Sequence, residues 1–246
     1  MKDCEVVDAF ISHLRKHGHP GLQVDRRPDE ENHDSPDIDA IAAGFAIEHT
    51  SIDTLPNQRR DADWFMRAVG GLEQELASNV SFRLNVTIEY NAVAKGQDWD
   101  AIRSSLKIWI TNEASALPDG AQILDNLPGI PFRLHVTKSS ERRPGVFFAR
   151  WKPEDDSLAD RVRVTFDRKA DKLARYHAEG KTTLLLVEND DIALMNEQKM
   201  LEAIRTAYPV GPPAGVHQIW YADTSIASEI EFRDFTPALE WDERFG

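Results

Sequence analysis

Apolar residues recur at helical spacing in five stretches of the chain. In the first, over residues 3–17, one helix face carries Val6, Val7, Phe10, Ile11 and Leu14. The other predicted helices cover residues 56–78, 98–114, 157–178 and 196–207. The second of these contains the pair Gly70-Gly71, and glycine has low helix propensity.

Strand patterns separate these helices. Apolar and polar residues alternate over 82–90, which predicts a half-buried strand. Other strands are predicted at 22–26, 131–138, 146–151, 182–187 and around Ile219 and Phe232, whereas 115–130 reads only as loop. Because helices and strands alternate, we expect an α/β fold: a single domain over residues 1–246, with a mixed central β-sheet flanked by helices.

Composition and charge limit the class of protein. Hydrophobic residues make up 41% of the 246 and charged residues 29%, which is typical of a globular protein with a buried core. The single cysteine, Cys4, forms no internal disulfide, and the N-terminus lacks a signal-peptide pattern, so a cytoplasmic location without a membrane partner is expected. The net charge of −13 disfavours indiscriminate binding to polyanions, but it does not exclude a local basic surface.

Residues 37–51 read as two short strands joined by a tight turn at Ala43-Gly44. Side chains two apart on a strand share a face. Asp37 is therefore expected on the same face as Asp39, Glu48 on the same face as Thr50, and Ile47 on the same face as His49. Glu48 emerges from an apolar strand, and a buried carboxylate needs a partner or a cation. Facing carboxylates suit Mg²⁺ or Mn²⁺. Alternatively, both acids are solvated or pair with arginines such as Arg59 or Arg60.

The spacing of the acids in this hairpin resembles the PD-(D/E)XK nuclease superfamily. Pro36-Asp37 is followed after about ten residues by Ile47-Glu48-His49-Thr50. The resemblance covers roughly residues 3–90 and implies a restriction-endonuclease-like core. It also implies Asp37 and Glu48 as metal ligands, the backbone carbonyl of His49 as a third ligand, and Asp39 as the alternative to Asp37. Thr50 stands where the superfamily has its catalytic lysine.

Two segments are candidates for supplying the missing group. Gln58, in the first turn of the helix after the hairpin, resembles a glutamine that some branches of the superfamily use. In the helix over 157–178, Lys169 falls inside the apolar stripe and Lys172 lies at its edge. A lysine in an apolar face needs a counter-ion or reaches solvent with its amine. We therefore consider Lys169 and Lys172 as catalytic candidates, with simple coverage of apolar surface as the alternative.

These observations favour a metal-dependent nuclease acting on DNA or RNA with Mg²⁺ or Mn²⁺. A second hypothesis is a catalytically inactive protein of the same fold that binds nucleic acid or serves as a subunit, as a homo-oligomer or with a protein partner. A third is an unrelated α/β protein whose hairpin acids form ion pairs for stability alone.

Overall fold

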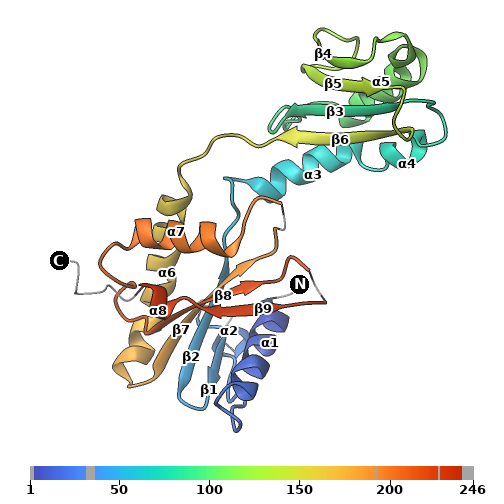
Figure 1. Ribbon diagram of the computed structural model, residues 1–246. Coiled ribbons are helices and arrows are strands. Elements are labelled where there is room, and N and C mark those ends of the chain that lie inside the picture. Colours follow the sequence, from blue (N-terminus) through green and yellow to red (C-terminus); the bar gives the residue numbers. More distant parts are fainter. Residues whose placement is uncertain (1–2, 32–36, 192, 227, 240–246) are drawn as a thin grey trace. The chain divides into compact units, whose positions relative to one another are not determined.

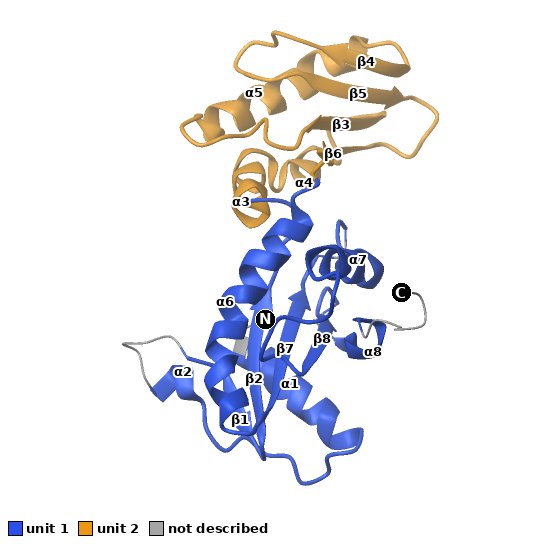
Figure 2. Ribbon diagram, turned by 90° about the vertical axis from the view of Figure 1, so that its left-hand side faces the viewer, with its two compact units in different colours: residues 1–56, 156–246 blue, residues 57–155 orange. Residues whose placement is uncertain are grey.

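The computed structural model describes residues 3–31, 37–191, 193–226 and 228–239. The chain folds into two compact units, which Figure 2 shows in different colours. Unit 1 is formed by residues 1–56 and 156–246, and unit 2 by residues 57–155. Each unit has its own sheet, so the structure differs from the single sheet that the sequence predicted. The predicted core over 3–90 also spans parts of both units.

Unit 1 is built on a five-stranded mixed sheet with the order β1-β2-β7-β8-β9. Its strands are β1 (Ala40–Ala42), β2 (Phe45–Ser51), β7 (Thr182–Asn189), β8 (Gln218–Asp223) and β9 (Glu231–Asp234). The three central strands are parallel, and the edge strands β1 and β9 are antiparallel to their neighbours. The helices are α1 (Asp3–Lys16), α2 (Pro28–Glu31), α6 (Leu158–Ala178), α7 (Glu197–Ala207) and α8 (Thr236–Leu239). The prediction of an α/β fold with a mixed sheet and flanking helices is confirmed.

The two faces of this sheet are covered by different helices (Figure 1). The apolar stripe of α1 packs against Ile47 of β2 and Leu184 of β7. On the other face, α6 and α7 pack against Ala46 and Leu185. Since strand residues alternate between faces, Glu48 lies on the α6 side of the sheet and His49 lies on the α1 side. This agrees with the predicted sharing of a face by Ile47 and His49, with Glu48 on the opposite face.

Unit 2 contains a separate four-stranded sheet with the order β4-β5-β3-β6. Its strands are β3 (Arg83–Glu89), β4 (Gly120–Leu124), β5 (Leu134–Ser139) and β6 (Gly145–Trp151). Its helices are α3 (Gln58–Val69), α4 (Leu72–Leu76), α5 (Trp99–Asn112) and a short 3-10 helix, Ala114–Ala116. The core lies between the helices and one face of the sheet, where α5 residues such as Leu106 belong to the same buried cluster as Leu84 and Val136.

Three local expectations from the sequence differ from the structure. The helix predicted over 56–78 is interrupted at Gly70-Gly71, where Gly71 has a φ of 80° that residues with a Cβ rarely adopt. The segment 115–130, which read as loop, contains β4. The strand expected over 22–26 is reduced to a single bridge between Arg26 and Ile41.

Candidate functional site

Glu48 is a fully buried carboxylate in the middle of β2, with 0% of its surface exposed. Its Oε1 atom accepts a hydrogen bond from the Lys169 amine of α6 and forms an ion pair with the Lys172 amine of the same helix. The Lys169 amine forms the shorter contact, and the Lys172 amine lies at 3.0 Å. Its Oε2 atom is also buried and has no hydrogen-bond partner among the described residues. One oxygen of this carboxylate thus meets two cations, while the other is buried without a partner in the described part of the chain.

Burial is the main influence on the protonation of Glu48. The pKa of the Glu48 carboxyl is raised to about 7, mainly because burial removes water from it and to a smaller extent because of the charge of Asp39. The amines of Lys169 and Lys172 lower this pKa, but their effect is smaller than that of desolvation. Glu48 therefore changes its charge near neutral pH, which is unusual for a glutamate and is common at functional sites.

Asp39 lies beside Glu48 at the start of the hairpin. Ala40 pairs with Ile47, so the same register continued by one residue places Asp39 opposite Glu48. The Oδ2 atom of Asp39 accepts a hydrogen bond of 2.7 Å from the backbone N–H of His49. Because the N–H and C=O of a strand residue point to the same side, the carbonyl of His49 is directed toward the same edge as Asp39.

Asp37 has a different environment, because its carboxylate is occupied by α6. Arg175 forms an ion pair with its Oδ2 atom, and the Tyr176 hydroxyl donates to its Oδ1 atom at 3.1 Å. The Lys172 amine donates to its backbone carbonyl at 2.7 Å. Asp37 thus joins the hairpin to α6, and Asp39 is the better placed of the two candidate ligands. Pro36, which precedes Asp37 in the motif, lies outside the described residues.

The amphipathic pattern of α6 explains how the two lysines reach the sheet. Val162, Phe166 and Leu173 are fully buried against it. The Lys169 side chain is 14% exposed and that of Lys172 is 23% exposed, and both amines end at Glu48. Lys169 therefore meets a counter-ion, which is one of the outcomes that the sequence left open for a lysine inside the apolar stripe.

Other predicted residues lie elsewhere. Thr50, at the position of the superfamily's lysine, is buried on β2. Gln58 is the first residue of α3 and belongs to unit 2, so its role at the hairpin stays a prediction. Arg59 and Arg60 belong to unit 2, so their suggested pairing with the hairpin acids stays a prediction; Arg60 forms an ion pair with Asp61.

A buried network on the opposite face of β2 was not predicted. The His49 Nε2 atom lies 3.1 Å from the Glu188 carboxylate, and the Thr224 hydroxyl donates to the same carboxylate at 2.5 Å. Burial raises the pKa of Glu188, but these hydrogen bonds outweigh burial and leave that pKa below its ordinary value. The sequence contained a signal for this buried carboxylate, since Glu188 directly follows the apolar run Leu184–Val187.

The donor set at the hairpin fits a hard divalent cation, although it is small. Within the described ranges, no three His, Cys, Asp or Glu side chains form a metal-binding group. The available oxygens come from Asp39 and Glu48, together with the backbone carbonyl of His49. The Oε2 atom of Glu48, which has no partner among the residues that the structure describes, is the observation that favours a ligand. Carboxylate and carbonyl oxygens suit Mg²⁺ or Mn²⁺.

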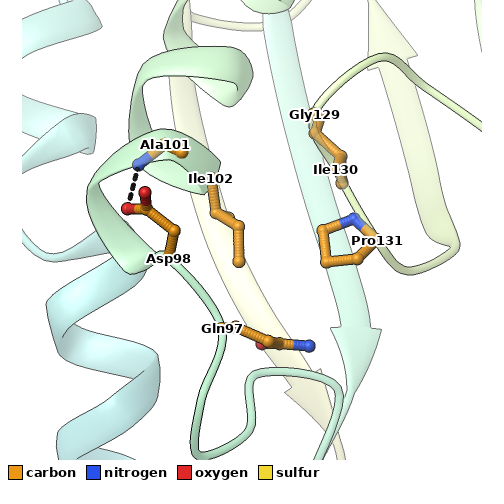
Figure 3. A pocket seen from close by; sticks show the side chains of 7 residues that line it. All are labelled: Gln97, Asp98, Ala101, Ile102, Gly129, Ile130 and Pro131. Atoms are coloured by element: carbon orange, nitrogen blue, oxygen red, sulfur yellow. Dashed lines mark hydrogen bonds between the residues drawn. The ribbon is translucent and has the colours of Figure 1, made fainter.

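A separate pocket of about 400 Å³ lies in unit 2 (Figure 3). Ile102 of α5 lies across it from Ile130 and Pro131. The polar side chains at its rim are engaged: Asp98 accepts from the N–H of Ala101 at 2.9 Å, and Gln97 bonds to the backbone of residues 92 and 94. This pocket is mainly apolar and brings no reactive groups together.

Comparisons with protein families, with curated proteins and with solved structures find no match for this chain. Among the residues that the structure describes, none of the helices has both the length and the apolar character needed to cross a membrane.

Proposed function

We propose that unit 1 holds the active centre of a metal-dependent nuclease that hydrolyses phosphodiester bonds in DNA or RNA. The observation that carries this proposal is the contact of Lys169 with Glu48, a fully buried carboxylate beside Asp39. One of its oxygens has no partner in the described part of the chain. An amine, two acids and a raised pKa in one place match the requirements of assisted hydrolysis.

The order of elements in unit 1 supports a divergent PD-(D/E)XK centre. The hairpin β1–β2 supplies the acids, α6 follows in unit 1, and β7 returns parallel to β2. In this proposal Lys169 takes the place that Thr50 leaves vacant, and Lys172 assists it. Both amines already contact the same carboxylate oxygen, which fits a lysine supplied by a helix instead of by the strand.

In this proposal each side chain has a defined role. Asp39, Glu48 and the His49 carbonyl hold Mg²⁺ or Mn²⁺, which would supply charge stabilisation for a phosphate and acidify a water molecule. Lys169 orients that water molecule or stabilises negative charge on the phosphate oxygens. Lys172 keeps the hairpin against α6 through the Asp37 carbonyl and adds positive charge.

A cleavage assay with the full chain tests this function. Labelled DNA and RNA, single- and double-stranded, are incubated with Mg²⁺, Mn²⁺ or EDTA. We expect cleavage that requires the metal and is lost in Glu48→Gln and Asp39→Asn. The matched control is Glu202→Gln, an exposed carboxylate on α7, which should leave cleavage unchanged.

The ion pairs of Glu48 also favour a second function. Two amines already neutralise one carboxylate oxygen, so the site is electrically balanced without a metal. We infer as the alternative a nuclease-fold protein that binds nucleic acid without cutting it. Calorimetric titration with Mn²⁺ separates the two functions. If no Mn²⁺ binding is found that is lost on replacement of Glu48, the non-cutting protein is the better explanation.

A further inference from the structure

The sheet of unit 2 has one covered and one open face. Helices α4 and α5 pack against the side that contains Leu84 and Val136. The opposite side chains point away from these helices, and unit 2 is described in full over residues 57–155. Several of them are large and exposed: Ile123 by 59%, Phe147 by 39% and Trp151 by 52%. An open sheet face with exposed aromatic rings is an unusual surface for a domain.

The register arranges this open face in rows across the strands. Asn85 on β3 lies opposite Phe147 on β6, and Thr87 lies opposite His135 on β5. Glu89 on β3 lies opposite Trp151. Phe147 and Trp151 are four residues apart on one strand, which is about 13 Å at the usual rise. Polar side chains therefore fill the centre of the face, and rings stand at two points along its edge.

Cationic and aromatic groups are combined on this face. The Arg83 guanidinium lies 4.1 Å from the centroid of the Phe147 ring. The His135 ring meets the Trp151 ring edge-on, with centroids 5.7 Å apart. Arginine planes and aromatic rings are the groups on which unpaired bases stack, and arginine also neutralises phosphate.

A cavity of about 440 Å³ continues this surface at the start of β6. Arg83, Arg143 and Phe147 line it. Glu73 also lines it, and its carboxylate accepts the N–H of Phe148 at 2.7 Å. Two arginines beside an exposed ring favour a ligand that carries both negative charge and flat apolar groups.

The distribution of charge over the chain supports the same ligand. Unit 2 has 13 lysines and arginines and 13 aspartates and glutamates, so the net charge of −13 falls entirely on unit 1. A polyanion is therefore repelled less by unit 2 than by the rest of the chain. The polar centre of the open face argues against a purely apolar protein partner.

We propose that the open face of the unit 2 sheet binds single-stranded nucleic acid, with bases stacked on Phe147 and Trp151 and phosphates held by Arg83 and Arg143. The inference deepens the proposed function, on which its biological meaning rests, because it assigns single strands as the substrate class. Duplex DNA, whose bases are already stacked and paired, lacks the free base faces that these rings require.

Fluorescence anisotropy in EDTA tests this binding without cleavage. The full chain is titrated into a labelled single-stranded oligonucleotide of about 20 residues, longer than a typical single-strand site, and into the matching duplex. We expect the single strand to bind more tightly. The double variant Phe147→Ala/Trp151→Ala should weaken this binding at least about tenfold, given the contribution of base stacking. The control Ile108→Ala removes an exposed apolar side chain of α5 and should bind like the wild type.

A second measurement guards against misfolded variants. Bound oligonucleotide should quench tryptophan fluorescence in the wild type, and Trp151→Phe should keep the binding but lose much of the quenching. Unchanged affinity in the double variant overturns the proposal, and so does absence of binding by the wild type. A dimer that the double variant dissociates, with oligonucleotide affinity unchanged, would instead identify the face as a contact between copies of the chain.

The two proposals fail in different ways. Loss of cleavage in Glu48→Gln together with normal oligonucleotide binding supports both. Binding that depends on Phe147 and Trp151, without any metal-dependent cleavage, overturns the nuclease and leaves the binding surface. Metal-dependent cleavage, with oligonucleotide binding that does not depend on Phe147 and Trp151, supports the nuclease and overturns the binding surface.

Discussion

At the scale of single residues, the protonation of Glu48 is the central property of the candidate site. Two amines contact its Oε1 atom, yet burial outweighs them and raises the pKa of Glu48 to about 7. An unfolded chain exposes the same carboxyl to water, where its pKa is 4.5. The folded protein therefore holds a proton more strongly than the unfolded chain between these two values.

The first prediction concerns stability and pH. The contribution of Glu48 to the free energy of unfolding is fully present below about pH 4.5 and is lost as pH rises through about 7. The reason is that burial makes ionisation of this carboxyl less favourable in the folded protein than in the unfolded chain. The total loss is about 3 kcal/mol. Denaturant unfolding at several pH values should show that the unfolding free energy of the wild type decreases by about this amount relative to that of Glu48→Gln as pH rises. A constant difference between the two proteins across this range would contradict the raised pKa.

The second prediction concerns Lys169. Replacing it with methionine removes an amine that lowers the pKa of Glu48 and leaves a buried charge with less compensation. We expect a loss of about 3 kcal/mol in unfolding free energy near pH 8, and a much smaller loss near pH 4, where Glu48 is protonated. The control Lys95→Met replaces an exposed lysine and should have little effect at either pH. Equal losses by Lys169→Met at both pH values would exclude Glu48 as the cause.

The third prediction concerns metal affinity. At the proposed metal site, Mn²⁺ would bind the ionised form of Glu48, so protons and metal would compete. With a pKa of about 7, the affinity should rise about tenfold between pH 6 and pH 8. Calorimetric titration of the wild type measures this change, and Asp39→Asn should weaken the binding throughout. Affinity that is independent of pH would place the metal away from Glu48.

Residue roles were predictable where they depend on local spacing. Alternation along β2 predicted the faces of Glu48 and His49, and helical periodicity predicted that Lys169 is drawn into the apolar stripe. The commitment of Asp37 to Arg175 was not predictable, because 138 residues separate the two positions. Periodicity indicates which way a side chain points, but only the tertiary fold decides which partner it meets.

At the scale of elements, breaks in the backbone explain most differences between prediction and structure. The apolar stripe over 56–78 continues through α3 and α4, so the pattern alone favoured one helix. Gly71 ends this continuity with a left-handed conformation. The strand β4 was missed because its exposed positions, such as Ala121 and Ile123, give no clear alternation between apolar and polar residues.

The fourth prediction concerns Gly71. A φ of 80° is open to glycine but strained for alanine, so Gly71→Ala should lower the stability of unit 2 by about 1 kcal/mol. Thermal unfolding measures the loss. Gly21→Ala is a suitable control, since its added Cβ would meet nothing within 4 Å and its backbone is not left-handed. Equal behaviour of the two variants would show that the break tolerates a side chain.

At the scale of the whole molecule, the division into two units was not visible in the sequence. No linker of distinctive composition marks the junctions near residues 56 and 156, and helices alternate with strands on both sides of them. The alternation that correctly predicted an α/β fold therefore also suggested one sheet. Which strands pair is decided by contacts distant in sequence, such as the pairing of β2 with β7.

The fifth prediction follows from the separate cores. Leu84 is fully buried in the core of unit 2, and Leu84→Ala should destabilise that unit by about 3 kcal/mol. Scanning calorimetry should show one transition that moves to lower temperature and another that stays. Binding of Mn²⁺ that depends on Glu48 should be preserved at temperatures at which unit 1 remains folded. A single transition that moves as a whole would mean that the units unfold together.

The sequence separation of 121 positions from Glu48 to Lys169 also imposes an order of events during synthesis. Both acids of the hairpin leave the ribosome first, all of unit 2 follows, and only then does α6 emerge with its amines. A nascent or prematurely terminated chain thus carries the acidic half of the centre without its basic half. If hydrolysis requires both halves, as proposed, the chain is inactive until α6 has been translated.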